Sequence, residues 1–175
     1  MFDIYQTSAN NSSRFVIGES GSRPIHVIAL NPSTADQNKS DTTITKIKNF
    51  SRKHDYSGFM VYNLYPQRST SPDNLHRRYN KGISSCNCNY IFDYISESKQ
   101  PDVWVAWGQM ITKRKYLKDC LRDIVDSLAP MNPNWMSIGS TTMDGHPRHP
   151  SRISYNNDFI PFNMVRYLDK LNKSR

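Results

Sequence analysis

The chain has 175 residues, a length that suits one domain with one hydrophobic core. Hydrophobic residues make up 37% and charged residues 22%, which excludes the composition of an intrinsically disordered protein. Lysine and arginine number 23 against 15 acidic residues, which gives a net charge of +8. This charge fits a polyanionic partner such as DNA or RNA. The alternative is that the basic residues only keep the protein soluble.

The first predicted elements are strands. Residues 1–22 predict an N-terminal edge strand or hairpin around Arg14–Ile17. Further along, short runs are nearly continuous in β-branched and aromatic residues, which is typical of strands buried on both faces of a parallel sheet. These runs comprise residues 25–30, 59–64 and 103–107, with a weaker fourth run at 135–138.

Segments with helical periodicity lie between and after these strands. Asp41 predicts the N-cap of a helix that continues through Asp55, with Ile44, Ile47 and Phe50 on its inner face. Further helices are predicted at 83–98, 110–128 and 158–172. Strand–helix alternation is typical of βαβ units, so the sequence predicts a single α/β domain over residues 1–175. The expected architecture is a three-layer α/β/α fold with a central, mostly parallel, four-stranded sheet.

Cysteine usage and hydropathy indicate the compartment. Cys86, Cys88 and Cys120 are too few for a disulfide framework or a four-cysteine metal cluster, so we expect free thiols in a reducing compartment, without a metal or another cofactor. The N-terminal residues 1–21 carry no apolar signal segment, and no stretch approaches the ~20 apolar residues of a membrane span. The expected protein is cytoplasmic and monomeric, without membrane contact.

Polar loops follow the carboxyl ends of all four predicted core strands. In an open parallel sheet these ends surround the ligand site, so we assign the loops to one site. The candidate residues are Asn31, Pro32, Ser33, Asp36, Asn63, Arg68, Trp107, Gln109, Arg148, His149, Ser151 and Arg152.

These side chains favour some chemistries over others. A phosphate-binding Walker loop, a dinucleotide fingerprint, a His-Glu-x-x-His zinc motif and a serine nucleophile elbow are all missing from the sequence. The remaining groups suit cleavage of a bond whose leaving group departs as an anion. Asn31, with Asp36 as a second candidate, would position a water, and His149 would donate to the developing oxyanion. Asn63 could read the edge of a base, and the arginines could hold phosphates.

Each candidate also has a purely structural interpretation. Asn31 before Pro32 could shape a turn, and Asp36 could cap the segment that follows it. Asn63 could bridge two loops, since a buried amide needs partners, and His149 could be a loop histidine bonded to backbone. The arginines are surface charges by default, and Trp107 could simply end a core strand.

Three of these segments resemble motifs of the uracil-DNA glycosylase superfamily. Leu30-Asn31-Pro32 is similar to its first motif, which in the mismatch-specific branch contains Asn-Pro with the Asn ordering the attacking water. Val61-Tyr62-Asn63-Leu64 resembles the second-strand segment, whose Asn contacts the flipped base in several branches. His149-Pro150-Ser151 resembles the His-Pro-Ser motif, in which the His stabilises the departing base anion and the next residues wedge into the DNA. Leu30 stands where the superfamily has glycine, so the resemblance does not extend to the identity of the base.

A closer resemblance is to a small bacterial and phage-associated family with four motifs, Asn-Pro-Ser-Thr-Ala-Asp, Asn-Leu followed by Arg-x-Thr, Trp-Gly, and Gly-x-Pro-x-His-Pro. Here the motifs read as Asn31–Asp36, Asn63-Leu64 with Arg68-Ser69-Thr70, Trp107-Gly108, and Gly145–Pro150.

Together the resemblances imply a uracil-DNA glycosylase-like fold and a monofunctional DNA glycosylase that removes a modified pyrimidine and leaves an abasic site. A role in anti-phage defence against DNA with glucosylated hydroxymethylcytosine is a further hypothesis. The implied catalytic residues are Asn31, His149 and Asp36, the substrate contacts Asn63, Pro32, Ser33, Gln109 and Trp107, and the DNA contacts Arg68, Arg148, Arg152 and Ser151. The alternatives are a non-catalytic nucleic-acid-binding module and a hydrolase of free modified nucleotides.

Overall fold

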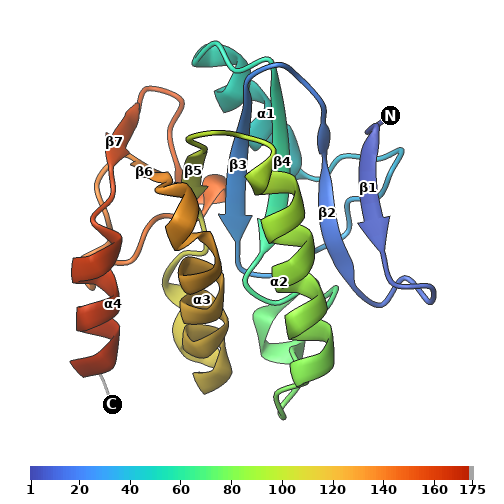
Figure 1. Ribbon diagram of the computed structural model, residues 1–175, viewed down its shortest axis with the longest axis vertical. Coiled ribbons are helices and arrows are strands. Elements are labelled where there is room, and N and C mark those ends of the chain that lie inside the picture. Colours follow the sequence, from blue (N-terminus) through green and yellow to red (C-terminus); the bar gives the residue numbers. More distant parts are fainter. Residues whose placement is uncertain (174–175) are drawn as a thin grey trace.

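The computed structural model describes residues 1–173, which form a mixed α/β fold around one sheet (Figure 1). Within this described part the sheet has seven strands in the order β1-β2-β4-β3-β5-β6-β7. Their bounds are β1 Ile4–Thr7, β2 Arg14–Glu19, β3 Pro24–Ala29, β4 Gly58–Asn63, β5 Asp102–Val105, β6 Asn134–Ile138 and β7 Phe159–Pro161.

The centre of the sheet is parallel. β4, β3, β5 and β6 are neighbours in that order, and each of them overlaps one of the four apolar runs of the sequence. The expectation of a four-stranded sheet is wrong, because antiparallel strands extend both edges. The β1–β2 hairpin pairs with β4 through β2, and β7 pairs with β6. In β2 the side chains of Val16 and Ile17 are fully buried, so only β1 is an edge strand on that side.

In residues 1–173, four α-helices flank the sheet, namely α1 Thr42–Lys53, α2 Lys81–Ser96, α3 Lys115–Leu128 and α4 Met164–Lys173. Two predicted helices begin later than expected. The segment predicted from residue 110 starts as the 3₁₀ turn η2 (Gln109–Lys113), and the extended backbone of Arg114 separates this turn from α3. The segment predicted from residue 158 starts as β7.

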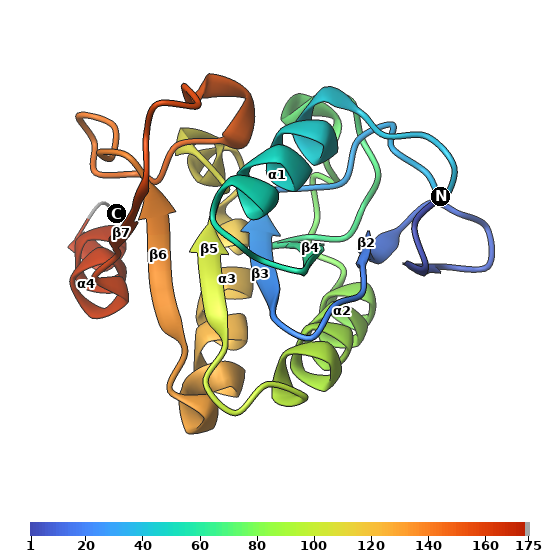
Figure 2. The same ribbon diagram turned by 90° about the horizontal axis from the view of Figure 1, so that it is seen from above.

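The sheet is covered on both faces. On the central strands, alternate residues point to opposite sides, so that Ile28 and Val105 pack with α2, α3 and α4, whereas Val27 and Trp104 pack with α1. Figure 1 shows α2 and α3 in front of the strands, and Figure 2 shows α1 on the side of the sheet away from them.

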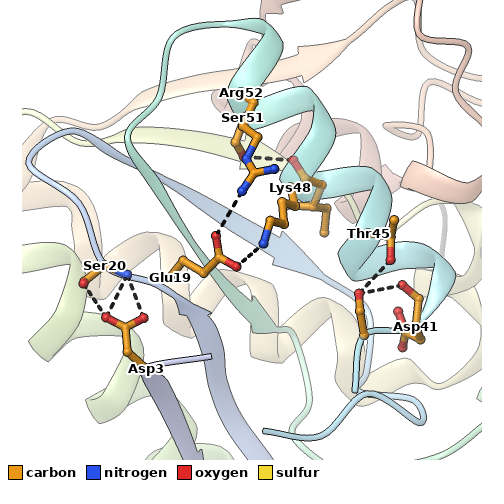
Figure 3. A network of polar contacts seen from close by, with 10 residues as sticks. Asp3, Glu19, Ser20, Asp41, Thr45, Lys48, Ser51 and Arg52 are labelled. Carbon is orange, nitrogen blue, oxygen red and sulfur yellow. Dashed lines mark hydrogen bonds and ion pairs between the residues drawn. The ribbon is translucent and has the colours of Figure 1, made fainter. Parts of the chain in front are cut away.

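Polar contacts fix α1 against the sheet. Glu19 at the end of β2 forms ion pairs with Lys48 and Arg52 of α1 (Figure 3). At the other end of the helix, Asp41 is the N-cap, as predicted, and its Oδ1 accepts a hydrogen bond from the backbone N–H of Ile44 at 2.9 Å. The N-terminus of α1 is therefore held at a defined position beside the ends of β3 and β4.

Cys86, Cys88 and Cys120 are free thiols. Within residues 1–173 no helix has the length and apolar character needed to cross a bilayer. No cluster of three or more His, Cys, Asp or Glu side chains in the same part of the chain could hold a metal ion.

Candidate functional site

A cavity of about 700 Å³ lies at the carboxyl ends of the parallel strands. Figure 2 shows the arrowheads of β3, β5 and β6 pointing to the same edge of the sheet. The volume lies within the ~300–1,000 Å³ that is usual for small-molecule sites. Candidate residues from all four strand ends line this main cavity: Asn31, Ser33, Asn63, Trp107, Gln109, Arg148, His149, Ser151 and Arg152.

The side chain of Asn31 is oriented by two backbone carbonyls. Its Nδ2 donates to Ser69 O at 2.8 Å and to Pro32 O at 3.0 Å, while the N–H of Ser69 donates back to Pro32 O at 2.8 Å. Because both partners of the amide are acceptors, the NH₂ group must face them and Oδ1 must face away. Asn31 lines the main cavity, so this oxygen is the acceptor that the residue can offer to a bound water.

His149 is held through its Nδ1 atom. The backbone N–H of Ser151 donates to Nδ1 at 3.3 Å, and the Ser151 hydroxyl lies 2.9 Å from the same atom. A nitrogen that accepts from a backbone N–H carries no proton, so the neutral ring has its proton on Nε2. Nε2 has no hydrogen-bond partner within residues 1–173, and His149 lines the main cavity. The ring therefore offers the cavity a neutral N–H donor.

Three effects set the protonation of His149. Burial lowers the pKa of the imidazole, Asp41 raises it, and Arg152 lowers it, with a net direction downward from the ordinary value of 6.5. The ring is consequently uncharged at neutral pH. An uncharged donor in a partly desolvated site stabilises a developing anion without bringing a mobile proton of its own.

Asn63 ends β4 and lies at the floor of the main cavity, with only 1% of its surface exposed. Its backbone carbonyl accepts from Asn87 Nδ2 at 2.8 Å, but its own side-chain Nδ2 is buried without a hydrogen-bond partner in the described part of the chain. A buried unsatisfied donor costs about 1–3 kcal/mol, so such groups are usually paired when a ligand or water is bound. Nδ2 of Asn63 is thus a donor for an acceptor atom of a ligand.

Asp41 is a site residue that the sequence indicated only as a helix cap. Its carboxylate accepts from the N–H of Ile44 through Oδ1 and from the N–H of Ala35 through Oδ2, at 2.9 and 3.3 Å. It also lines the main cavity and is close enough to His149 to raise the pKa of that ring. Neither periodicity nor motif spacing indicated this second role, because it depends on how residues 31–41 fold back over the strand ends.

Three predicted site residues do not line the main cavity, namely Pro32, Asp36 and Arg68. The carboxylate of Asp36 accepts from the backbone N–H groups of Asn38 and Lys39, which lower its pKa and make it a turn-forming group. The guanidinium of Arg68 donates to the Ala35 carbonyl at 3.1 Å and to the Tyr5 hydroxyl at 3.2 Å. Arg68 therefore supports the loop that carries Asn31.

Arg14 shares this supporting role. Its side chain is 2% exposed, and its Nη1 donates to the same Ala35 carbonyl at 2.7 Å. Burial and the neighbouring Arg68 lower the pKa of Arg14, against the opposite effect of Asp41, to a net value of about 10. Two guanidinium groups on one carbonyl, with a carboxylate nearby, fix the loop from Asn31 to Asp41 in place.

The remaining predicted residues contribute less directly. Trp107 is 1% exposed and lines the main cavity, and its indole N–H donates to the Tyr167 hydroxyl at 3.0 Å, which fixes the ring in the core beside the cavity. Arg148 lines the main cavity and donates through Nε to the Ser140 carbonyl at 2.9 Å. Arg152 is exposed at the rim, where its charge also acts on His149.

Comparison with known proteins gives a family but no described activity. No curated protein and no solved structure matches the chain. One family model, described as a protein of unknown function (DUF1643), matches residues 14–151, from the start of β2 to the loop that carries His149. The match covers well over half of the chain and includes Asn31, Asn63 and His149. The chain therefore belongs to the family described as protein of unknown function DUF1643.

Proposed function

We propose that this protein is a monofunctional DNA glycosylase, with a fold like that of the uracil-DNA glycosylases, which hydrolyses the N-glycosidic bond of a modified pyrimidine. The observation that carries the proposal is the state of His149, a neutral imidazole with Nδ1 held by Ser151 and Nε2–H open to the main cavity. A fixed neutral donor suits a leaving group that departs as an anion, as a pyrimidine does when its glycosidic bond breaks.

In the proposed reaction the target nucleotide is flipped out of the stack into the main cavity, at a cost of a few kcal/mol. The C1′–N bond breaks, its electron pair leaves with the base, and Nε2–H of His149 stabilises the resulting anion. A water held by Oδ1 of Asn31 adds to C1′ of the oxocarbenium-like sugar. The proton lost by that water neutralises the base anion, so the products are a free base and an abasic site.

Four further side chains support this reaction. The carboxylate of Asp41, which two backbone hydrogen bonds hold in place, would lie beside the positive charge that develops on the sugar. Asn63 offers its unpaired Nδ2 to a carbonyl oxygen on the edge of the base. Arg148 and Arg152 at the rim would hold phosphates, which makes DNA binding dependent on salt.

The proposed substrate is a modified pyrimidine, and phage DNA with hydroxymethylated or glucosylated cytosine is the first candidate. A monomeric, cytoplasmic enzyme with this specificity would serve in defence against phage. The motif resemblances and the +8 charge of the chain support this view.

Base release from a panel of DNAs tests the proposal. The panel contains DNAs with uracil, with mismatched bases, with alkylated bases, and with hydroxymethylated or glucosylated cytosine. Abasic sites are detected by alkaline cleavage, and free bases are detected by mass spectrometry. We expect one substrate to react, and Asn31→Ala and His149→Ala each to lower its rate by about 10²-fold or more. Salt-sensitive DNA binding without any released base would instead indicate a nucleic-acid-binding module. Release of base from free nucleotides alone would indicate a nucleotide hydrolase.

A further inference from the structure

A second cleft, of about 410 Å³, adjoins the main cavity. The two share Gln109 and Met110 of η2 as common lining residues. The other residues of this second cleft come from η2, α3, α4 and the loop after β6, and they are Thr112, Lys113, Lys118, Asp144, His146, Tyr167, Lys170 and Leu171.

A chain of hydrogen bonds fixes the orientation of His146 in the second cleft. The indole N–H of Trp107 donates to the Tyr167 hydroxyl at 3.0 Å, and this hydroxyl lies 2.8 Å from His146 Nδ1. An indole can only donate, so the tyrosine oxygen accepts from it and its own proton is free to go to Nδ1. The neutral imidazole then carries its proton on Nε2.

Nε2 of His146 is the polar atom of interest in the second cleft. The residue is only 7% exposed, yet it lines the cleft, and Nε2 has no hydrogen-bond partner within residues 1–173. Burial lowers the pKa of His146, and the nearby Lys170 and Lys118 lower it while Asp144 raises it. Nε2–H of His146 is therefore the donor that the ring can offer to a ligand in the second cleft.

The charges around His146 indicate the kind of ligand. Among residues 1–173, the ammonium groups of Lys113, Lys118 and Lys170 and the carboxylate of Asp144 line the second cleft. Lys113 also forms an ion pair with Asp73 at 2.8 Å, and Lys118 donates to the Leu171 carbonyl at 3.4 Å. These contacts hold the two ammonium groups near the second cleft. Ammonium groups together with a neutral imidazole N–H form a set of donors that suits the oxygens of a phosphate.

We infer that the second cleft is a phosphate-binding subsite, in which Nε2–H of His146 and the lysines around it hold the phosphodiester next to the nucleoside in the main cavity. The identity of that phosphate as part of DNA rests on the proposed function, whereas phosphate binding by the cleft does not. The shared residues Gln109 and Met110 give the reason for the assignment, because a flipped nucleotide in the main cavity has its flanking phosphate at the cavity boundary. The hydrogen-bond chain from Trp107 to His146 also runs from the lining of one cavity to the lining of the other.

Titration with inorganic phosphate tests the subsite itself. In ¹H–¹⁵N spectra of the histidine rings, we expect phosphate to shift the Nε2 signal of His146 and to leave that of the exposed His76 unchanged. The Tyr167→Phe variant, which removes the hydrogen bond to Nδ1, should bind phosphate more weakly. Absence of a phosphate-dependent shift at His146 in the folded wild-type protein would overturn the inference.

DNA binding tests the source of the phosphate. Each phosphate contact contributes about 0.9 to the slope of log affinity against log salt concentration. Lys113→Gln and Lys118→Gln should each lower that slope, whereas Lys115→Gln, which removes an exposed charge outside the second cleft, should leave it unchanged. Two lysine positions are used so that a fold defect in one variant does not decide the result.

The outcomes separate the two proposals. A smaller slope in the cleft variants without base release from any DNA supports the subsite and overturns the glycosylase. A shift of His146 with phosphate but equal slopes in all three lysine variants shows a site for free phosphate and overturns its assignment to the DNA backbone.

Discussion

Gly108 lies directly against His149. A Cβ atom added at Gly108 would come within 3.3 Å of the Cβ of His149, closer than nine in ten real Cβ contacts. Gly108 also has φ 69° and ψ −173°, a conformation that is essentially restricted to glycine. The chain thus crosses from β5 to η2 in a form that leaves space for the imidazole at the cavity wall.

Gly108→Ala should therefore impair both stability and base release. The strained backbone costs about 1–3 kcal/mol, and the added methyl group displaces the ring from the position that Ser151 holds. A lower melting temperature and a reduced single-turnover rate are the expected results. Gly82→Ala in the first turn of α2 is the matched control, because its Cβ has room and helical alanine is favoured, so its stability should rise and its rate should stay unchanged. Equal rates for Gly108→Ala and the wild type would show that the position of His149 is unimportant.

Asn31→Ala should lower the single-turnover rate by about 10²–10⁴-fold, because the attacking water loses its acceptor. Loss of the hydrogen bond to Ser69 should also lower stability by about 1 kcal/mol. Substrate affinity, measured separately by fluorescence anisotropy, should change little. Asn49→Ala, on the exposed side of α1, serves as the control with the same change of side chain. A loss of affinity with an unchanged rate would contradict the assigned role.

The pH dependence of base release should depend on His149. The neutral ring is the active form, and its pKa lies below the ordinary 6.5, so the rate should be constant near neutral pH and should fall as the pH drops through the lowered pKa. Asp41→Asn removes a charge that raises this pKa, so the acid limb should move to lower pH. Arg152→Gln removes a charge that lowers it, so the limb should move to higher pH. A profile that does not respond to either change would exclude His149 as the titrating group.

Substitutions at Asp41 can separate the effect of its charge on His149 from its contribution to the stability of α1. Asparagine caps helices about as well as aspartate, so Asp41→Asn should keep the stability of α1, whereas Asp41→Ala should lose about 1 kcal/mol. Asn80→Ala removes the cap of α2 away from the main cavity. The Asn80→Ala variant should lose a similar amount of stability, measured by thermal unfolding. The pH profile of its single-turnover rate should not shift.

The parallel core of the sheet and the grouping of the strand-end loops could be predicted from the sequence, because both follow from the burial of the central strands. Strands buried on both faces are nearly continuous in apolar residues, and β3, β4 and β5 are so except at His26, Asn63 and Asp102, so their runs stand out. The carboxyl ends of parallel strands then meet at one edge, which brought Asn31, Asn63 and His149 together without any knowledge of long-range contacts.

Other features depend on contacts that leave no local pattern. β7 has three residues, includes Pro161 and exposes Ile160, so nothing in its sequence separates it from the start of the next helix. The position of Arg68 is set by Ala35, 33 residues away, and by Tyr5 in β1, so an exposed arginine and a loop-supporting arginine look alike in the sequence. The contribution of Asp41 to the main cavity likewise follows from the fold of the loop before α1.

His26 should make the stability of the protein depend on pH. The ring is fully buried in β3, where its Nδ1 lies 3.1 Å from the Tyr62 hydroxyl, and burial lowers the pKa to about 4 although Asp102 raises it. The unfolded chain takes up a proton at this residue below about pH 6.5, whereas the folded chain does so only near pH 4. The unfolded state therefore binds more protons within that interval, and the free energy of unfolding should fall by about 3 kcal/mol as the pH drops through it.

Urea unfolding at several pH values measures how the free energy of unfolding depends on pH. His26→Asn should flatten the slope relative to the wild type whatever its absolute stability, and His76→Gln at an exposed position should leave it unchanged. A wild-type slope that His26→Asn does not alter would show that another group is responsible for it.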